Sequence, residues 1–210
     1  MQASGLGRGA RAPNAAAMAA RAWLVAAVFN CMRCTAPIAL LALACALALP
    51  IQAAETYAEE DRSWGVEPPP GYRAKDYHAP TPDALPGARI VRTAELKEML
   101  ERDPRPFLVD VLSGPVHRSL PGALWLHNGG LGDFDAAEEQ RFLDVLARLS
   151  GHDKAREIVF FCSGSHCWLS YNAALRATRA GYTNVYWYRG GIEAWREAGL
   201  PTRTTDNFQW

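Results

Sequence analysis

Apolar and polar residues follow two patterns from residue 88 onward. Short apolar runs have the length and content typical of buried strands: ARIV, PFLVDVL, GALWL, EIVFF and NVYWY. Other segments place apolar residues every three or four positions, as amphipathic helices do: TAELKEMLE, DAAEEQRFLDVLARLSG, CWLSYNAALRATRAG and GGIEAWREAGLP. Strands joined by helices of this length predict an α/β fold with a central parallel sheet flanked by helices on both faces.

Some of these helices contain residues that favour a defined start or end. Thr93 is the expected N-cap of the first helix. Asp135 and Glu138 have the spacing of a capping box, and Gly151 is the expected C-cap of that same helix. The helix that follows the cysteines is expected to stop at Gly181.

Residues 55–87 differ from this domain in composition, because they are rich in Pro, Gly, Tyr and charge. Their prolines forbid a regular helix. Their aromatic residues, among them Trp64 and Tyr77, favour docking over full disorder. We therefore expect an extended arm, either laid over the domain of residues 88–202 or serving as a linker, and a short C-terminal tail at residues 203–210.

The N-terminal residues have the pattern of a targeting segment. Met32 and Arg33 precede a continuous apolar run, residues 36–49, and small residues follow it. This is the pattern of a secretory signal peptide over residues 32–54, with residues 1–31 as an upstream extension. The run is shorter than the roughly 20 apolar residues of a membrane span. The prediction is an exported, periplasmic protein without a stable membrane span after processing; the alternative is an uncleaved anchor, which Arg33 would interrupt.

Charge and cysteine content change once this segment is removed. The full chain has 22 basic and 22 acidic residues and no basic stripe, so we expect no nucleic-acid partner. Cleavage leaves 18 basic against 22 acidic residues. It also removes Cys31, Cys34 and Cys45, so that Cys162 and Cys167 remain as an isolated pair.

In an oxidising compartment this pair is either a disulfide or is kept reduced by a partner. A structural disulfide across so short a loop would stabilise the fold by roughly 2 kcal/mol. That is a small gain, so the interpretation that the pair has a chemical role gains weight, and the structural disulfide remains the alternative at this point.

Cys162 lies directly after the strand run EIVFF, where ligands bind in parallel α/β sheets. The turn from strand to helix directs backbone N–H groups and the helix dipole toward one spot, which stabilises a thiolate there. Ser163, Gly164 and Ser165 are small enough for the backbone to wrap closely around the sulfur. His166 could add a positive charge or accept a proton. The same arrangement would hold a persulfide, a sulfenate or a small anion.

Other candidate residues have two interpretations each. Trp168 either packs at the helix start or contacts substrate. His117 and Arg118 either face the cysteine loop or lie in a solvated loop, and Asp110 at a strand end is expected to be a structural hydrogen-bonding residue. Zinc ligation by the two cysteines and His166 lacks a fourth ligand, and the C-x-x-C-H haem pattern is absent. We therefore expect no metal and no cofactor.

Four segments together resemble the landmarks of a rhodanese-like domain, over residues 88–202. They are DV (Asp110 and Val111), SLPGALWL, IVFFCSGSHCW and VYWYRGGIEAWREAGLP. The resemblance implies that Cys162 accepts a sulfane sulfur as a persulfide and passes it to a thiophile, with the amides of residues 163–168 as the sulfur cradle. Leu112 and Cys167 stand where this family usually has arginines, which disfavours ordinary thiosulfate sulfurtransferase activity.

A narrower resemblance covers most of the mature chain. GYRAKDYHAPTPDALPGA, HRSLPGALWLHN and TNVYWYRGG are similar to segments of exported rhodanese-like proteins with a CXXCW motif, which are associated with pyrroloquinoline quinone (PQQ)-dependent alcohol catabolism. Here four residues rather than two separate the cysteines. The resemblance implies redox cofactor handling and a quinoprotein dehydrogenase system as partner.

Two classes of function follow. In the first, the protein is a sulfurtransferase-like enzyme or thiol oxidoreductase whose substrate is a small sulfur donor or thiol acceptor. Cys162 would attack, and Cys167 would release the bound sulfur or resolve a sulfenate. In the second, the protein is a non-catalytic accessory module with a structural disulfide.

Overall fold

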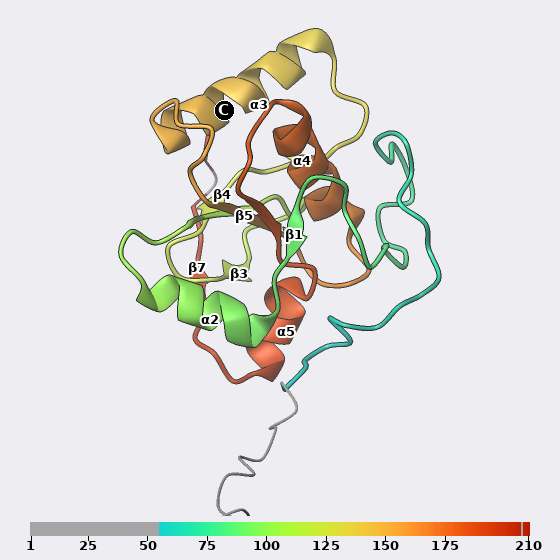
Figure 1. Ribbon diagram of the computed structural model, residues 1–210, viewed down its shortest axis with the longest axis vertical. Coiled ribbons are helices and arrows are strands. Elements are labelled where there is room, and N and C mark those ends of the chain that lie inside the picture. Colours follow the sequence, from blue (N-terminus) through green and yellow to red (C-terminus); the bar gives the residue numbers. More distant parts are fainter. Residues whose placement is uncertain (1–54, 207) are drawn as a thin grey trace, which may run out of the picture. The chain divides into compact units, whose positions relative to one another are not determined.

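The computed structural model of the protein describes residues 55–206 and 208–210 (Figure 1). The predicted upstream extension, the predicted signal peptide and their three cysteines lie outside the described residues. Within the part described, no helix combines the length and apolar character needed to cross a membrane.

The central sheet has five parallel strands, as the sequence pattern predicts. In spatial order they are β1 (Arg89–Ile90), β6 (Val185–Trp187), β5 (Ile158–Phe161), β2 (Phe107–Asp110) and β4 (Leu124–Trp125). Two further strands, β3 (Arg118–Ser119) and β7 (Arg203–Thr204), form a separate antiparallel pair that the sequence did not predict. β5 lies at the centre of the sheet, so its carboxyl end is surrounded by neighbouring elements.

Helices cover both faces of the sheet. They are α2 (Thr93–Glu101), α3 (Ala136–Ser150), α4 (Trp168–Arg179) and α5 (Gly191–Glu197). Figure 1 shows α3 and α4 on one side of the strands and α2 and α5 on the other. Side chains of β5 point alternately into the two layers, so Phe160 packs with the α3 and α4 cluster and Phe161 with the α2 and α5 cluster. The predicted fold class is confirmed.

The ends of the helices agree with the predictions at α3 and differ at α2. Asp135 and Glu138 form the expected capping box, and Gly151 takes the left-handed conformation with φ 63°. The prediction that Thr93 caps α2 is wrong, because Thr93 is already helical and Arg92 is the N-cap residue. Glu60 in the arm takes over the capping role: its Oε2 accepts hydrogen bonds from the amide and the hydroxyl of Thr93, at 2.9 and 2.8 Å.

The arm is docked onto the domain. Arg189, which is buried after β6, donates to the carbonyl oxygens of Glu60 and Thr81 and to the Thr81 hydroxyl. Asn172 in α4 donates to the Arg73 carbonyl and accepts from the Arg73 amide. Arg189 therefore holds the arm at residues 60 and 81, and Asn172 holds it between these two points, at Arg73.

Candidate functional site

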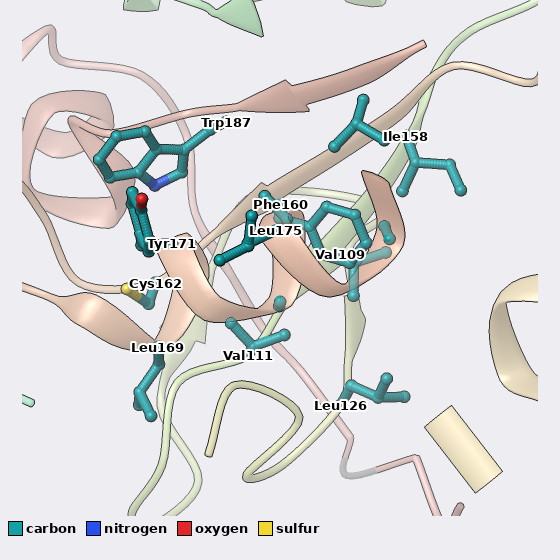
Figure 2. Packing of buried hydrophobic residues seen from close by; sticks show 14 of the residues in the cluster. Val109, Val111, Leu126, Ile158, Phe160, Cys162, Leu169, Tyr171, Leu175 and Trp187 are labelled. Atoms are coloured by element: carbon teal, nitrogen blue, oxygen red, sulfur yellow. The ribbon is translucent and has the colours of Figure 1, made fainter. Parts of the chain in front are cut away.

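Cys162 follows β5 directly and is bonded to Cys167 in a disulfide, with the two Cα atoms 6.3 Å apart. Their exposed fractions are 1% and 5%, so both are buried. Figure 2 shows Cys162 in the same core cluster as Tyr171 and Trp187. The pair that the sequence singled out is therefore brought together, at the carboxyl end of the central strand.

A hydroxyl group lies beside the Cys162 sulfur. Ser170 Oγ is 3.0 Å from Cys162 Sγ, and Trp187 Nε1 donates to the same hydroxyl oxygen at 2.9 Å. All three side chains are buried. A disulfide sulfur has no proton, so the Ser170 hydroxyl has two acceptors within reach: Cys162 Sγ, and Cys167 O at 3.4 Å. Sequence reasoning missed Ser170; its signal is weak, a serine three positions beyond Cys167 on the inner side of a helix.

The backbone of the cysteine loop differs in part from the expected sulfur cradle. The Cys167 amide donates to Gly164 O at 3.0 Å, and the Trp168 amide donates to Tyr77 O at 2.9 Å. The four amides of residues 163–166 have no hydrogen-bond acceptor among the described residues. In the disulfide form, four of the six amides expected to form the sulfur cradle are therefore available to a ligand.

The arm pairs with the outer edge of the same loop. Ala79 N donates to His166 O at 2.9 Å, and Thr81 N donates to Ser165 O at 3.2 Å. The Thr81 hydroxyl donates to Ser165 O as well, at 2.7 Å, and accepts from Arg189 Nε at 3.0 Å. The arm therefore acts as an added strand beside the loop, and Arg189 links the two through Thr81.

His166 and Trp168 face the arm rather than the sulfur atoms. The half-buried His166 ring lies 4.7 Å from the Trp64 ring and 6.1 Å from the His78 ring. Trp168 is buried, and its Nε1 donates to Pro80 O at 3.1 Å. The packing interpretation of Trp168 agrees with this position.

A pocket of about 500 Å³ lies beside the loop. Its walls come from the segment after β2, from β3, from α5 and from the cysteine loop: Leu112, His117, Arg118, Ser163, Ile192, Glu193, Arg196 and Thr202. Ser163, the residue after Cys162, is half-buried at this wall. The segment containing His117 therefore faces the cysteine loop, which was one of its two interpretations.

α5 approaches the loop closely because Gly191 has no side chain. A Cβ at Gly191 would lie 2.4 Å from Cys162 O, and its φ of 58° favours glycine. The amides of Ile192 and Glu193 can then donate to the carbonyls of Cys162 and Ser163, at 3.0 and 2.8 Å. These bonds tie the start of the cysteine loop to the N-terminal turn of α5.

Asp110 organises the charged wall of the pocket. Its buried carboxylate accepts hydrogen bonds from His117 Nε2 at 2.8 Å, Ser119 Oγ at 2.5 Å and the Leu112 amide at 2.9 Å. The expectation that Asp110 is a structural hydrogen-bonding residue is confirmed. The Asp110 hydrogen bond raises the pKa of His117 above its usual value near 6.5, against the opposing effect of burial.

The described residues contain no group of three or more His, Cys, Asp or Glu side chains placed to hold a metal ion.

Comparison with known families decides the classification. The family described as "Rhodanese-like domain" matches residues 92–198, which is half of the chain. The chain belongs to the rhodanese-like domain family. The match spans the β-strand, cysteine loop and helix of the candidate site as well as the Asp110 segment.

Three solved structures that are similar to this rhodanese-like chain have low sequence identity with it. The polysulfide-sulfur transferase homodimer of Wolinella succinogenes is 20% identical, with 56% of this chain and 79% of that chain covered and a TM-score of 0.41. The thiosulfate sulfurtransferase of Pseudomonas aeruginosa is 18% identical, covering 57% and 21%, with a TM-score of 0.40. The rhodanese-like domain of an Anabaena protein is 19% identical, covering 60% and 92%, with a TM-score of 0.38. No curated protein matches the chain.

Proposed function

We propose that this rhodanese-like protein is a redox-active sulfur carrier whose Cys162–Cys167 disulfide is the oxidised form of its working site. The observation that carries the proposal is the disulfide itself, which joins Cys162, the sulfur acceptor implied by the resemblance, to a second cysteine in the same loop. The pair lies at the carboxyl end of β5, where ligands bind in such sheets. Four amides of the loop have no acceptor among the described residues and are available to a bound sulfur or anion.

The proposed cycle is balanced in atoms and electrons. Two external thiolates reduce the disulfide in successive exchange steps and leave as one external disulfide. The Cys162 thiolate then takes a sulfane sulfur from a donor and forms a persulfide, while the donor leaves without that sulfur. The Cys167 thiolate attacks the inner sulfur of Cys162, which releases hydrosulfide and forms the Cys162–Cys167 disulfide again.

The surroundings of Cys162 support its role as the attacking residue. The loop ends at the N-terminus of α4, whose dipole favours negative charge nearby. The Ser170 hydroxyl can donate a hydrogen bond to a Cys162 thiolate. The hydrogen bond that Trp187 Nε1 donates to Ser170 Oγ holds this hydroxyl beside the sulfur. Cys167 at the N-cap position is close enough to resolve the persulfide, since the disulfide forms without further partners.

We extend the proposal to the periplasm. The apolar segment of residues 36–49 and its flanks support export, and the resemblance to exported CXXCW proteins supports a link to PQQ-dependent alcohol catabolism, with a quinoprotein dehydrogenase system as partner. Expression in a Gram-negative host tests the export step. The periplasmic fraction should contain a chain beginning at Ala54 or Glu55, whereas an intact N-terminus in that fraction would contradict cleavage.

Intact-mass measurement on the mature protein tests the chemistry. The reduced wild-type protein, given an organic persulfide, should return to the disulfide mass and release sulfide in equal amount. Cys167→Ser should keep one extra sulfur atom and release none, because the resolving thiol is missing. Cys162→Ser is the matched control and should gain no sulfur.

The burial of both sulfur atoms beneath the arm favours a second candidate, the non-catalytic accessory module with a structural disulfide. The same measurement separates the two. A disulfide that resists thiols, together with variants that gain no sulfur from any donor, would exclude the carrier and favour the accessory module.

A further inference from the structure

The pocket beside the cysteine loop has a marked charge. Four of its wall residues carry ionisable side chains: His117, Arg118, Glu193 and Arg196. Of these only Glu193 is acidic, and its carboxylate lies over the loop, since Oε2 would be 2.3 Å from a Cβ added to Gly164. The Glu193 side chain therefore lies next to the loop, and the two arginines contribute positive charge to the rest of the wall.

The environment of His117 stabilises the imidazolium. Its Nε2 lies 2.8 Å from the buried Asp110 carboxylate, and its Nδ1 lies 3.3 Å from Pro115 O. Both ring nitrogens face acceptors, and only the imidazolium can donate to both at once. The raised pKa of His117 agrees with this geometry. The wall thus has three cationic groups against one carboxylate.

Position and shape restrict what this wall can bind. Arg118 is held by hydrogen bonds to the hydroxyl and carbonyl oxygens of Thr202 in the segment leading to β7, so its charge has a fixed place. Leu112 and Ile192 add an apolar surface. A volume of about 500 Å³ is within the range of small-molecule sites. These features fit an organic anion better than a bare inorganic one.

We propose that this pocket binds the carboxylate end of a small organic thiol whose sulfur reduces the loop disulfide. The inference rests on the proposed function, and it names the substrate class of the reductive half of the cycle. The first thiolate attacks one sulfur of the disulfide, forms a mixed disulfide and expels the other cysteine as a thiolate, which takes up a proton. A second thiolate attacks the mixed disulfide, releases the external disulfide and leaves the other cysteine as a thiolate.

The cations come from β3, its flanking residue and α5, not from the loop. The fifth position after Cys162, where the family usually has an arginine, is a cysteine here. An anion-binding group at that position is therefore replaced by a resolving thiol. The wall residues Arg118 and Arg196 supply positive charge from outside the loop, and guanidinium groups suit carboxylates.

Three small thiols of similar size but different charge provide the test: mercaptopropionate, mercaptoethanol and cysteamine. The rate of reduction of the oxidised full-length mature protein is measured with each, normalised to the thiolate concentration, and divided by the rate at which the same thiolate reduces a small uncharged disulfide, which removes differences in intrinsic nucleophilicity. We expect mercaptopropionate to react on the order of tenfold faster than mercaptoethanol at low ionic strength, with cysteamine slowest, and the differences to shrink with salt.

Substitutions assign the preference to the pocket. The double variant Arg118→Gln/Arg196→Gln should lose the preference for mercaptopropionate, and Arg196→Gln alone, which leaves the β3–β7 contact intact, should lose part of it. Glu193→Gln should increase the preference. Arg148→Gln, which removes one exposed charge on α3, is the matched control and should behave as wild type.

The outcomes separate this inference from the proposed function. Equal rates for the three thiols relative to the reference disulfide, or a preference that survives in the double variant, would overturn the pocket assignment and leave the carrier chemistry standing. A disulfide that none of the three thiols opens, even at high concentration, would overturn both.

Discussion

The reactivity of Cys162 depends on its contacts with two buried side chains. Trp187 Nε1 donates to the Ser170 hydroxyl oxygen and holds it 3.0 Å from Cys162 Sγ, where the hydroxyl can donate to a Cys162 thiolate in place of Cys167 O at 3.4 Å. A thiolate is a better acceptor than a disulfide sulfur, so the hydrogen bond stabilises the reduced form of the pair more than the oxidised form. A more stable reduced form makes a disulfide more oxidising.

Replacing Ser170→Ala should therefore shift the site toward the disulfide. The reduction potential of the Cys162–Cys167 pair should become more negative, and reduced Cys162 should be alkylated roughly fivefold more slowly near neutral pH, as expected for one lost hydrogen bond of about 1 kcal/mol. Redox titration against glutathione buffers and alkylation rates measure the two effects.

Two variants serve as controls for this substitution. Ser170→Thr keeps the hydroxyl and should restore the alkylation rate. Ser150→Ala removes a hydroxyl on α3 that has no contact with either cysteine, and it should leave both quantities unchanged. An unchanged potential in Ser170→Ala would mean that the hydroxyl does not act on the sulfur.

Single residues could be predicted from the sequence where their signal is local. Cys162 and Cys167 stand out because they directly follow an apolar strand run and are close in sequence. Ser170 and Arg189 acquire their importance from contacts with side chains and carbonyls far away in the chain, so no local pattern indicates them. His117 was an open case, because only the bond to Asp110 places it on the pocket wall.

At the scale of elements, the arm and the cysteine loop behave as one paired unit. The segment of residues 77–81 adds an extended strand to the loop, and Thr81 connects that strand to both Ser165 and Arg189. Because Arg189 is buried and donates three hydrogen bonds to the arm, its loss would leave several acceptors without a donor.

The substitution Arg189→Met should weaken this unit. We expect the free energy of unfolding to fall by about 3 kcal/mol, since buried acceptors in the arm lose their donors. The disulfide should also be reduced faster by a fixed thiol, because the strand that covers the loop is released more often. Urea unfolding and the reduction rate measure the two consequences.

Arg179→Met is the matched control, because Arg179 also donates to an arm carbonyl, that of Pro70, but from an exposed position. Its effect on the free energy of unfolding should stay within about 0.5 kcal/mol. If Arg189→Met lowered stability but left the reduction rate unchanged, the arm would not control access to the disulfide.

Elements were predictable where the pattern of apolar residues was long enough. All five parallel strands and the four helices of the described part match apolar runs or helical spacing in the sequence. β3 and β7 have two residues each, mostly exposed, so they show no such pattern. The start of α2 was misplaced because Glu60, more than thirty positions earlier, supplies the capping carboxylate that a local rule assigned to Thr93.

At the scale of the whole described domain, stability comes from two apolar layers and the docked arm, and the disulfide is a small addition. Clusters on both faces of the sheet contain most of the large buried side chains. The cysteines are only five positions apart, so their bond removes few conformations from the unfolded chain. A bond that contributes little to stability can open and close during a reaction cycle without unfolding the protein.

Reduction of the disulfide should therefore lower the free energy of unfolding by only about 2 kcal/mol, the chain-entropy value for so short a loop. The dependence on urea concentration should stay nearly the same, because the surface exposed on unfolding hardly changes. The double variant Cys162→Ala/Cys167→Ala, which cannot form the bond, should unfold close to the reduced wild type. A much larger loss, together with faster proteolysis of the arm in the reduced protein, would instead mean that the bond holds the arm and loop in place, which is the behaviour of a structural disulfide.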